Sequence, residues 1–340
     1  MTKLQAQIWQ LRKNSFEIGQ EYGLFLKKNP KTLEIYKQVT KPEIDMRNME
    51  AIYLEFAPYL LEELHGLADT LEVSLAEASA LFSGYDVPKT KAMGCTTWIH
   101  NGVYTRNYDF SPLLYDGIFS LIQSKNYYAS AGYNLQLIGR HDGMNEKGLA
   151  IGFHFVSNDG YTKGVSPWIS CRMVLDQCAT VEEAVKLLER IPHANCYNFS
   201  IGDKLGNKAA VETSPEKVKV RLGQDSLACT NHFITEAMSC NNRANIEGSL
   251  KRQRHLDEWS YPNMQQQELF DYFRADSSPL FFTDYDNFFG TLHTFSYSFK
   301  DHFIMTCLAG SDKPLLVDFK KWVEGENISE TVLMGNMPKA

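Results

Sequence analysis

The chain has 340 residues, of which 44% are hydrophobic, with a formal net charge of −7 and a pI near 5.8. This length and composition fit one large domain or two ordinary ones with a sizeable buried core. The acidic balance and the absence of a long basic block argue against nucleic acid as a partner. The short basic cluster Lys251-Arg252-Arg254 is more typical of a helix face or an anion clamp.

The start of the chain and its cysteines bear on the compartment. Met1 is followed by polar residues rather than by the apolar core of a signal peptide, and no run of about 18 apolar residues predicts a membrane helix. The seven cysteines form no C-x-x-C pair, a usage typical of a reduced intracellular protein. We therefore expect a cytoplasmic protein without a membrane span, in which most thiols are small core residues.

The first part of the chain, residues 1 to about 92, has a helical pattern. An apolar stripe recurs at three- and four-residue spacing and predicts an amphipathic helix: Leu60, Leu64, Leu67 and Leu71. Ser74 and Glu77 form a capping box, so a second helix is predicted from there to about Phe82. Gly84 and Pro88 end this helical zone.

From Cys95 onward the pattern changes to short β-strands. Two strands, 96–100 and 103–110, flank Asn101-Gly102, the strongest short hairpin signal. Thr180 with Glu183 forms another capping box and predicts a helix to about Arg190. Further strands are expected at 118–123, 135–138, 149–156, 198–202, 208–212, 218–222, 291–299, 304–308 and 315–319, and further helices at 249–259 and 265–273. This order predicts an α+β fold with antiparallel sheets covered by helices.

A two-residue turn at Asn101-Gly102 fixes the register of the hairpin. The opposed pairs are then His100 with Val103, Trp98 with Thr105, and Cys95 with Tyr108. The side chains of Cys95 and Arg106 fall on one face of this ladder, together with Thr97 and Tyr108. Asp109 falls on the other face unless a bulge re-aims it, although it is still able to meet an α-amino group at Cys95.

The chemistry of Gly94-Cys95 suggests a nucleophile that is exposed by self-cleavage. The thiolate is the reactive form of cysteine, and a nearby guanidinium lowers the thiol pKa. If the chain breaks before Cys95, the new α-amino group has a pKa near 7.7–8.0 and acts as a base for its own side chain. Gly94 has no Cβ, so the sulfur is able to approach the Gly94 carbonyl for an N→S acyl shift.

Four motifs in order resemble those of the choloylglycine hydrolase and penicillin acyltransferase superfamily of N-terminal-nucleophile hydrolases. The resemblance is strongest to the acyl-CoA:6-aminopenicillanic acid acyltransferase branch. The motifs are Gly94-Cys95-Thr96-Thr97-Trp98 with Arg106-x-x-Asp109, Asp142-Gly143-Met144-Asn145-Glu146-Lys147-Gly148-Leu149, Thr230-Asn231, and Ser249-Leu250-Lys251-Arg252.

This resemblance implies an αββα sandwich of two antiparallel sheets between helices, with residues 1–94 as a helical pro-segment and 95–340 as the catalytic domain. It implies linear amide hydrolysis or acyl transfer, with Cys95 as nucleophile and Arg106 and Asp109 beside it. Asn231 is the implied oxyanion donor, and Arg252 lies near the nucleophile. His154 stands where relatives have an oxyanion or substrate-binding asparagine or tyrosine, which leaves the substrate class open.

The histidines and cysteines show no metal-binding spacing, and no G-x-S-x-G or Walker sequence is present, so we expect no metal and no cofactor. The expected partner is a small N-acyl amide or acyl thioester, and a homo-oligomer stays open. Two alternatives remain. One is an unprocessed hydrolase that uses Cys95 with His154 or His232 as base. The other is a scaffold of the same fold that only binds a ligand.

Overall fold

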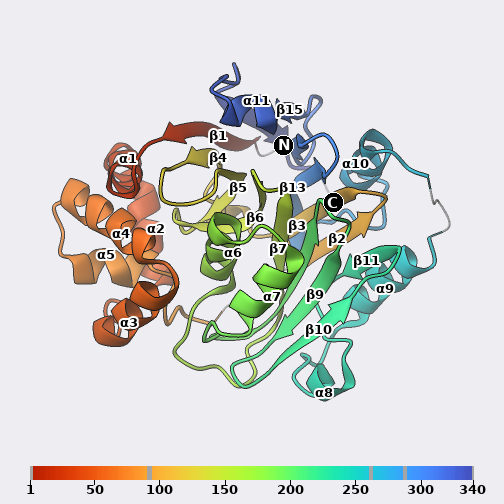
Figure 1. The fold of residues 1–340 in the computed structure, drawn as a ribbon, viewed down its shortest axis with the longest axis horizontal. Coiled ribbons are helices and arrows are strands. Elements are labelled where there is room, and N and C mark those ends of the chain that lie inside the picture. The colour runs from red at the N-terminus through yellow and green to blue at the C-terminus, as the bar shows by residue number, and fades with distance from the viewer. Residues whose placement is uncertain (1–2, 90–93, 260–262, 286–288, 339–340) are drawn as a thin grey trace.

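Two β-sheets pack face to face in the computed structural model, which describes residues 3–89, 94–259, 263–285 and 289–338 (Figure 1). The larger sheet has nine strands in the order β10-β9-β8-β7-β6-β5-β4-β1-β16. Their bounds are β10 (Val218–Leu222), β9 (Lys208–Thr213), β8 (Cys196–Asp203), β7 (Leu149–Ser157), β6 (Gly139–Asn145), β5 (Ser130–Leu135), β4 (Ile118–Gln123), β1 (Lys3–Arg12) and β16 (Val332–Asn336).

The smaller sheet carries the predicted hairpin. Its strands run in the order β11-β2-β3-β13-β14-β15, and β12 pairs with β13 outside this path. The bounds are β11 (Ser226–Cys229), β2 (Gly94–His100), β3 (Val103–Phe110), β13 (Phe289–Ser298), β14 (Phe303–Leu308), β15 (Leu315–Asp318) and β12 (Thr283–Asp284). Contacts of β2 with β7 and of β13 with β6 join the two sheets, so the residues between them are buried from both sides.

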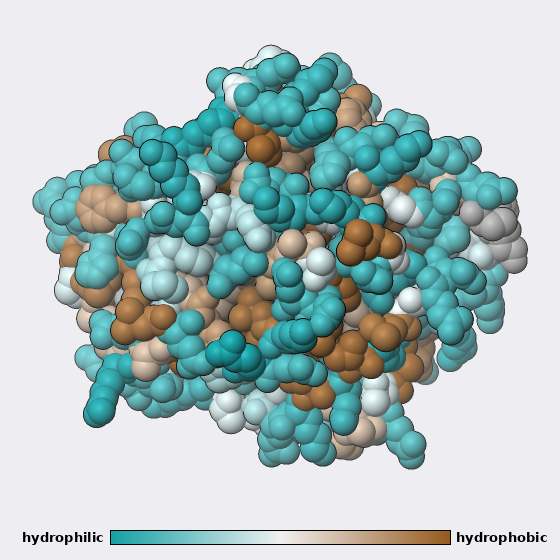
Figure 2. Space-filling view, viewed as in Figure 1, coloured by the Kyte–Doolittle hydropathy of each residue, from teal (hydrophilic) through white to brown (hydrophobic). Residues whose placement is uncertain are grey.

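Helices cover the outer faces of both sheets and complete the expected αββα layering. Helices α6 (Pro167–Gln177) and α7 (Val181–Leu188) pack on the larger sheet, in front in Figure 1. Helices α9 (Glu247–Asp257) and α10 (Gln266–Arg274) pack on the smaller sheet. The short elements are α8 (Glu236–Ser239), α11 (Phe319–Val323) and the 3₁₀ turn η1 (Pro112–Leu114). Figure 2 shows hydrophobic residues gathered near the centre and lower right of the front face, amid hydrophilic surface.

The N-terminal segment is not wholly helical, and this part of the prediction is wrong for its first residues. Residues Lys3–Arg12 form β1, which lies between β4 and β16 in the larger sheet. Leu4, Ala6 and Ile8 are buried at alternate positions, which is the period of a strand rather than a helix. Strand β1 pairs parallel with β4, and it is the exception among the described ladders, since the other neighbouring strands pair antiparallel.

Five helices follow β1 and form a group on the left of Figure 1: α1 (Ser15–Lys28), α2 (Pro30–Val39), α3 (Met46–Phe56), α4 (Pro58–Leu71) and α5 (Leu75–Phe82). The predicted leucine stripe lies on α4, where Leu60, Leu64 and Leu67 are fully buried. Ser74 caps α5 by accepting from the Glu77 N–H, and Thr180 caps α7 in the same way with Glu183. Both predicted helix starts are therefore confirmed.

The strand expected at 135–138 is instead the turn between β5 and β6. Gln136 and Leu137 have positive φ values of 55° and 61°, which reverse the chain although both residues are non-glycine. The apolar residues of this stretch fit burial in a turn as well as they fit a strand. No helix among the described residues is long and apolar enough to cross a membrane. The same residues contain no group of three or more His, Cys, Asp or Glu side chains arranged to hold a metal ion.

Candidate active site

The hairpin β2–β3 has the register that the sequence predicts. Cys95 pairs with Tyr108, Trp98 with Thr105, and His100 with Val103. Asn101 and Gly102 have φ values of 47° and 72°, as the two-residue turn requires. This local turn therefore determines which side chains of β3 lie opposite Cys95.

Arg106 contacts the Cys95 thiol directly. Its Nη2 lies 3.0 Å from Cys95 Sγ, and neither residue is exposed to solvent. The same Nη2 donates to the Phe153 carbonyl at 2.5 Å, and Nη1 donates to Asp142 Oδ2 at 2.5 Å. The guanidinium is therefore held between β3, β6 and β7, with one edge against the sulfur.

Asp109 lies on the opposite face of the ladder from the thiol, as its parity predicts, and pairs with Gly94. Asp109 Oδ1 accepts from Thr291 Oγ1 at 2.7 Å, whereas Oδ2 is buried with no hydrogen-bond partner among the described residues. A Cβ built on Gly94 lies 2.9 Å from this Oδ2 and 2.5 Å from the Phe289 ring. A larger residue than glycine at position 94 requires the Phe289 ring and the Asp109 carboxylate to shift, and the free carboxylate oxygen lies beside the expected junction.

Asn231 follows β11 and approaches the backbone of Cys95. Two donors point at its Oδ1, the Cys95 N–H at 2.8 Å and Arg252 Nη2 at 3.0 Å, so this atom is the amide oxygen. The Asn231 Nδ2 donates to the Phe155 carbonyl at 3.0 Å. An amide NH₂ has two hydrogens, so a second donor remains at Nδ2.

Arg252 lies on α9 and contacts the other side of Cys95. Its Nη1 donates at 2.6 Å both to the Cys95 carbonyl and to Thr96 Oγ1. The fold thus brings Arg106, Asp109, Asn231 and Arg252 to one junction, although α9 and the hairpin are far apart in the sequence. The sulfur, nitrogen and carbonyl oxygen of Cys95 each have a polar partner from this set.

His154 lies on β7 between the two sheets. Its Nε2 is 2.9 Å from Ser200 Oγ and 3.3 Å from Thr97 Oγ1, and its ring lies next to the Cys95 backbone. Adjacent strand residues point their backbone groups to opposite edges. The Phe153 and Phe155 carbonyls point to Arg106 and Asn231, so the His154 N–H points toward β8, where His154 pairs with Asn198. By the same alternation, the N–H groups of Phe153 and Phe155 both point to the edge of β7 that faces Arg106 and Asn231.

The electrostatics of the intact chain keep the thiol protonated. Burial raises the pKa of Cys95 to about 11, and Arg106 opposes this rise. Burial also raises the pKa of Asp109 above its usual value, with Arg252 as the main opposing charge. Cys95 therefore needs a base before it becomes a nucleophile.

Sequence reasoning missed two residues of this site. Asp142, the ion-pair partner of Arg106, stood out only as part of a motif, and His293 on β13 carried no sequence signal at all. His293 Nε2 lies 2.9 Å from Asp142 Oδ2. Ser249, quoted as part of the fourth motif, accepts from the Asn231 N–H at 2.7 Å and is near His232 Nδ1 at 2.8 Å. The hydrogen bond to Cys95 Sγ that the described residues supply comes from Arg106 and not from a histidine.

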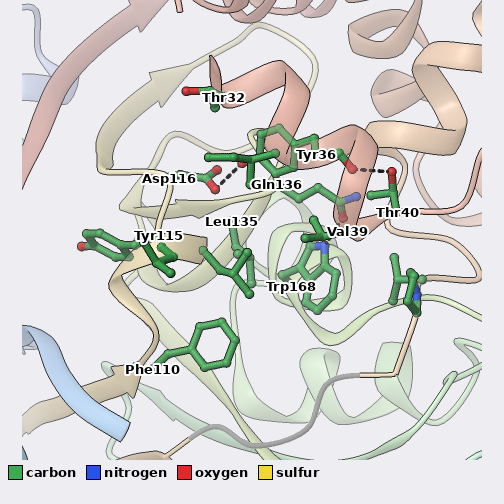
Figure 3. A pocket seen from close by; sticks show the side chains of 15 residues that line it. Thr32, Tyr36, Val39, Thr40, Phe110, Tyr115, Asp116, Leu135, Gln136 and Trp168 are labelled. Carbon is green, nitrogen blue, oxygen red and sulfur yellow. Dashed lines mark hydrogen bonds between the residues drawn. The ribbon is translucent and has the colours of Figure 1, made fainter. Parts of the chain in front are cut away.

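An apolar cavity of about 170 Å³ lies at the end of β3 (Figure 3). Its walls come from α2, from Val87 and Pro88, from the end of β3 and the segment that follows it, from the β5–β6 turn and from α6. Phe110 lines it, one alternate position beyond Tyr108 on the face of β3 that carries Arg106. Tyr36 and Asp116 share a short hydrogen bond at its polar edge, as Figure 3 shows.

Comparison with protein families gives one match that spans more than half of the chain. Residues 98–313 match the family described as acyl-coenzyme A:6-aminopenicillanic acid acyl-transferase. The chain therefore belongs to this family of N-terminal-nucleophile hydrolases. Membership indicates an amide hydrolase or acyltransferase. A comparison with curated protein sequences finds no match.

Solved structures of three enzymes are similar at low identity. A mutant of the conjugated bile acid hydrolase from Clostridium perfringens is 16% identical, with a TM-score of 0.47, over 73% of this chain and 98% of that one. Penicillin V acylase from Agrobacterium tumefaciens is 17% identical, with a TM-score of 0.39, over 67% and 86%. A Caenorhabditis elegans ortholog of N-acylethanolamine-hydrolyzing acid amidase is 14% identical, with a TM-score of 0.40, over 60% and 93%.

Proposed function

We propose that the chain cleaves itself between Gly94 and Cys95 and then acts as an amide hydrolase or acyltransferase with Cys95 as its N-terminal nucleophile. The observation that carries this proposal is the arrangement around Cys95. Arg106 contacts its sulfur, Asn231 its backbone nitrogen and Arg252 its carbonyl oxygen. A purely structural cysteine does not need two buried guanidinium groups, because burying charge is costly.

In the cleavage step, Cys95 Sγ adds to the Gly94 carbonyl carbon and the thiol proton passes to the Cys95 nitrogen. The C–N bond then breaks and leaves a thioester between Gly94 and Cys95. Water hydrolyses this thioester, which releases the Gly94 carboxylate, the free thiol and the α-amino group. The unpaired Asp109 Oδ2 lies beside Gly94 and is able to accept a hydrogen bond from the new amine.

After cleavage, the new α-amine is a base carried by the same residue as the thiol. Its usual pKa is near 7.7–8.0, so a fraction is neutral near pH 7 and accepts the thiol proton. Asn231 Oδ1 already accepts from this nitrogen at 2.8 Å and holds it in place. Arg106 then stabilises the thiolate that remains.

Turnover follows the same chemistry on an external amide. The Cys95 thiolate adds to the acyl carbon, and the protonated α-amine delivers its proton to the leaving amine. The second Asn231 Nδ2 hydrogen and a backbone N–H of β7 beside His154, from Phe153 or Phe155, are the proposed donors to the oxyanion. Water then hydrolyses the acyl thioester to a carboxylic acid and free Cys95, or an acceptor amine takes the acyl group instead.

The acyl part of the substrate is assigned to the apolar cavity beside α2. Tyr108 lies opposite Cys95, and Phe110 continues the same strand face into the cavity lining. The other lining residues are mainly apolar, including Ile35, Val39 and Leu114. An N-acyl compound with an apolar acyl group therefore fits this side of the site better than a charged one does.

Intact-mass analysis of the purified protein tests the cleavage. The wild type is expected to give two fragments that meet at Cys95, and Cys95→Ala is expected to remain one chain. The processed enzyme is then assayed on N-acyl amides that vary in the acyl and amine parts. A wild-type chain that stays intact and inactive on all of them contradicts the proposal. An intact chain that is active, and is inactivated by alanine at His154 or His232, supports the unprocessed alternative instead.

A further inference from the structure

A buried chain of hydrogen bonds leads from the Cys95 thiol through both sheets to the wall of the cavity. Arg106 Nη1 donates to Asp142 Oδ2 at 2.5 Å, on the side of the guanidinium away from the sulfur. The same Asp142 oxygen lies 2.9 Å from His293 Nε2. The other ring nitrogen, His293 Nδ1, lies 3.0 Å from the Tyr115 hydroxyl, and Tyr115 lines the cavity.

The protonation of this chain follows from the partners of each group. Burial lowers the pKa of His293, so its ring is neutral near pH 7 and has one donor and one acceptor nitrogen. A carboxylate only accepts, so Nε2 carries the proton toward Asp142 and Nδ1 accepts from Tyr115. The hydroxyl of Tyr115 therefore selects the His293 tautomer that donates to Asp142.

The surroundings of His293 leave it little freedom. Its ring stacks on Tyr133 at 3.7 Å between centroids and on Tyr108 at 5.3 Å, and it is not exposed to solvent. Asp142 Oδ2 accepts hydrogen bonds from both Arg106 and His293, while Oδ1 has no hydrogen bond among the described residues. The His293 donor is therefore the second of two contacts that fix the carboxylate.

We propose that Asp142 and His293 are positioning residues that hold Arg106 against the Cys95 thiol, with Tyr115 fixing the His293 tautomer from the cavity wall. This rests on the proposed function, in which Arg106 stabilises the thiolate. Loss of the His293 donor frees Asp142 to move, and Arg106 then moves with its counter-ion. The contact between Arg106 Nη2 and Cys95 Sγ weakens as a result.

Thiol reactivity measures this contact without a substrate and without cleavage. Alkylation of Cys95 by iodoacetamide is followed between pH 7 and pH 10 by the mass of the peptide that carries it. The charged groups that act on this thiol include Arg106 and Asp109 on β3, Asp142 on β6, Arg252 on α9, and Arg243 in the segment before α9. Asp142 is affected by the charged Arg106, by the neutral His293 through its hydrogen bond, and by the nearby ring of His141.

The decisive pair of variants is His293→Leu and His293→Gln. Both remove the imidazole stacking, but only glutamine keeps an N–H donor for Asp142. The leucine variant is expected to alkylate about tenfold more slowly, with its pH profile displaced upward by about one pH unit. The glutamine variant is expected to keep most of the wild-type rate. Equal rates for the two variants overturn the proposal, because a purely structural histidine does not distinguish them.

Two further variants distinguish the proposed effect from a general loss of folding. His193→Leu is the matched control, because the His193 side chain is also buried but bonds the Leu188 carbonyl rather than a charged group among the described residues, and it is expected to alkylate like the wild type. Tyr115→Phe keeps the ring and removes only the hydroxyl, so it is expected to lower the rate in the same direction but less than His293→Leu. An unchanged pH profile for Tyr115→Phe contradicts its assigned role. The mass of the Cys95 peptide distinguishes the cleaved from the intact form, and rates are compared between variants within one form, so a change in cleavage does not imitate the expected effect.

Discussion

At the scale of single residues, the pKa values of two buried aspartates near Cys95 are shifted in opposite directions. Burial raises the pKa of Asp109, and Arg252, Thr291 and Arg106 offset this only in part. Burial also acts on Asp142, but His293 and Arg106 outweigh it and hold the Asp142 pKa below its usual value. Asp142 therefore stays ionised, whereas Asp109 beside the junction takes up a proton more easily than an ordinary aspartate does.

These opposite pKa shifts predict opposite pH dependences of the free energy of unfolding for Asp142→Asn and Asp109→Asn. Asp142 ionises more easily in the folded chain, so it stabilises the fold above about pH 4 and this stabilisation is lost as the pH falls further. Asp142→Asn is therefore expected to lower the free energy of unfolding by about 3–5 kcal/mol at pH 7 and by less at pH 3. Asp109 ionises less easily, so Asp109→Asn is expected to gain stability relative to the wild type as the pH rises above about 4. Denaturant unfolding measured at several pH values checks both signs, and parallel trends contradict the assignment.

A bulky residue in the cavity is expected to change acyl selectivity. Val39 lines the cavity from α2 and is 39% exposed, so Val39→Trp places a bulky side chain at the cavity wall. We expect kcat/KM for long apolar N-acyl amides to fall by about tenfold or more and that for N-acetyl amides to change little. Leu54→Trp on α3, at a 64% exposed position, is the control. Equal losses on both substrate types count against the acyl assignment.

The hairpin side of the site could be predicted from the sequence, but its remote side could not. Asn101-Gly102 fixes the pairing of Cys95 and Arg106 through a two-residue turn, so local chemistry sufficed there. Asp142 meets Arg106 because β6 lies in the facing sheet, and His293 meets Asp142 because β13 pairs with β3. No local pattern encodes that packing. The family motifs located Asn231 and Arg252 without predicting that both contact the Cys95 backbone.

At the scale of elements, α1 and α4 approach each other through glycine. A Cβ on Gly19 lies 1.9 Å from the Glu63 carbonyl oxygen, and a Cβ on Gly66 lies 2.0 Å from the Phe16 carbonyl oxygen. Both clashes are with backbone, so the helices have to separate to admit even alanine. The close crossing also brings Glu63 toward the core, where it pairs with Arg172 of α6 at 2.6 Å.

Alanine substitutions test this crossing. Gly19→Ala and Gly66→Ala are each expected to lower the melting temperature by several degrees, as overpacking costs about 1–3 kcal/mol. Gly248→Ala on α9 is the matched control, since nothing lies within 4 Å of a Cβ at that position. It is expected to be neutral or slightly stabilising, because alanine favours the helix over glycine. Equal melting temperatures for the three variants contradict a tight crossing of α1 and α4.

Strand β1 shows why one element was missed. Its partners are β4 and β16, and both lie far along the chain from it. The alternation of apolar and polar residues in β1 is visible in the sequence. The leucine stripe and the capping box further along nevertheless favour a helical interpretation of the whole segment. The prediction of a strand at 135–138 was wrong because a buried turn and a buried strand have similar apolar compositions, which a short sequence pattern does not distinguish.

At the scale of the whole molecule, residues before Cys95 are part of the same fold as residues after it. Strand β1 has a neighbour on each side in the larger sheet, and the Glu63–Arg172 pair is fully buried. After cleavage, the two fragments are therefore expected to remain together and to elute as one species in size-exclusion chromatography. Denaturant is expected to separate them. A small fragment that elutes alone under native conditions contradicts this.

The pairing of β1 with β16 sets an order of events during synthesis. Lys3 lies opposite Asn336, so this early strand acquires its second neighbour only when the chain has been made as far as β16. Contacts of such large sequence separation form late, because closing a long loop costs entropy before the contact repays it. Asn231 and Arg252 also reach Cys95 from the later part of the chain. We therefore expect self-cleavage to wait until these later segments have been translated, which protects a nascent chain from being cut before its two parts are joined.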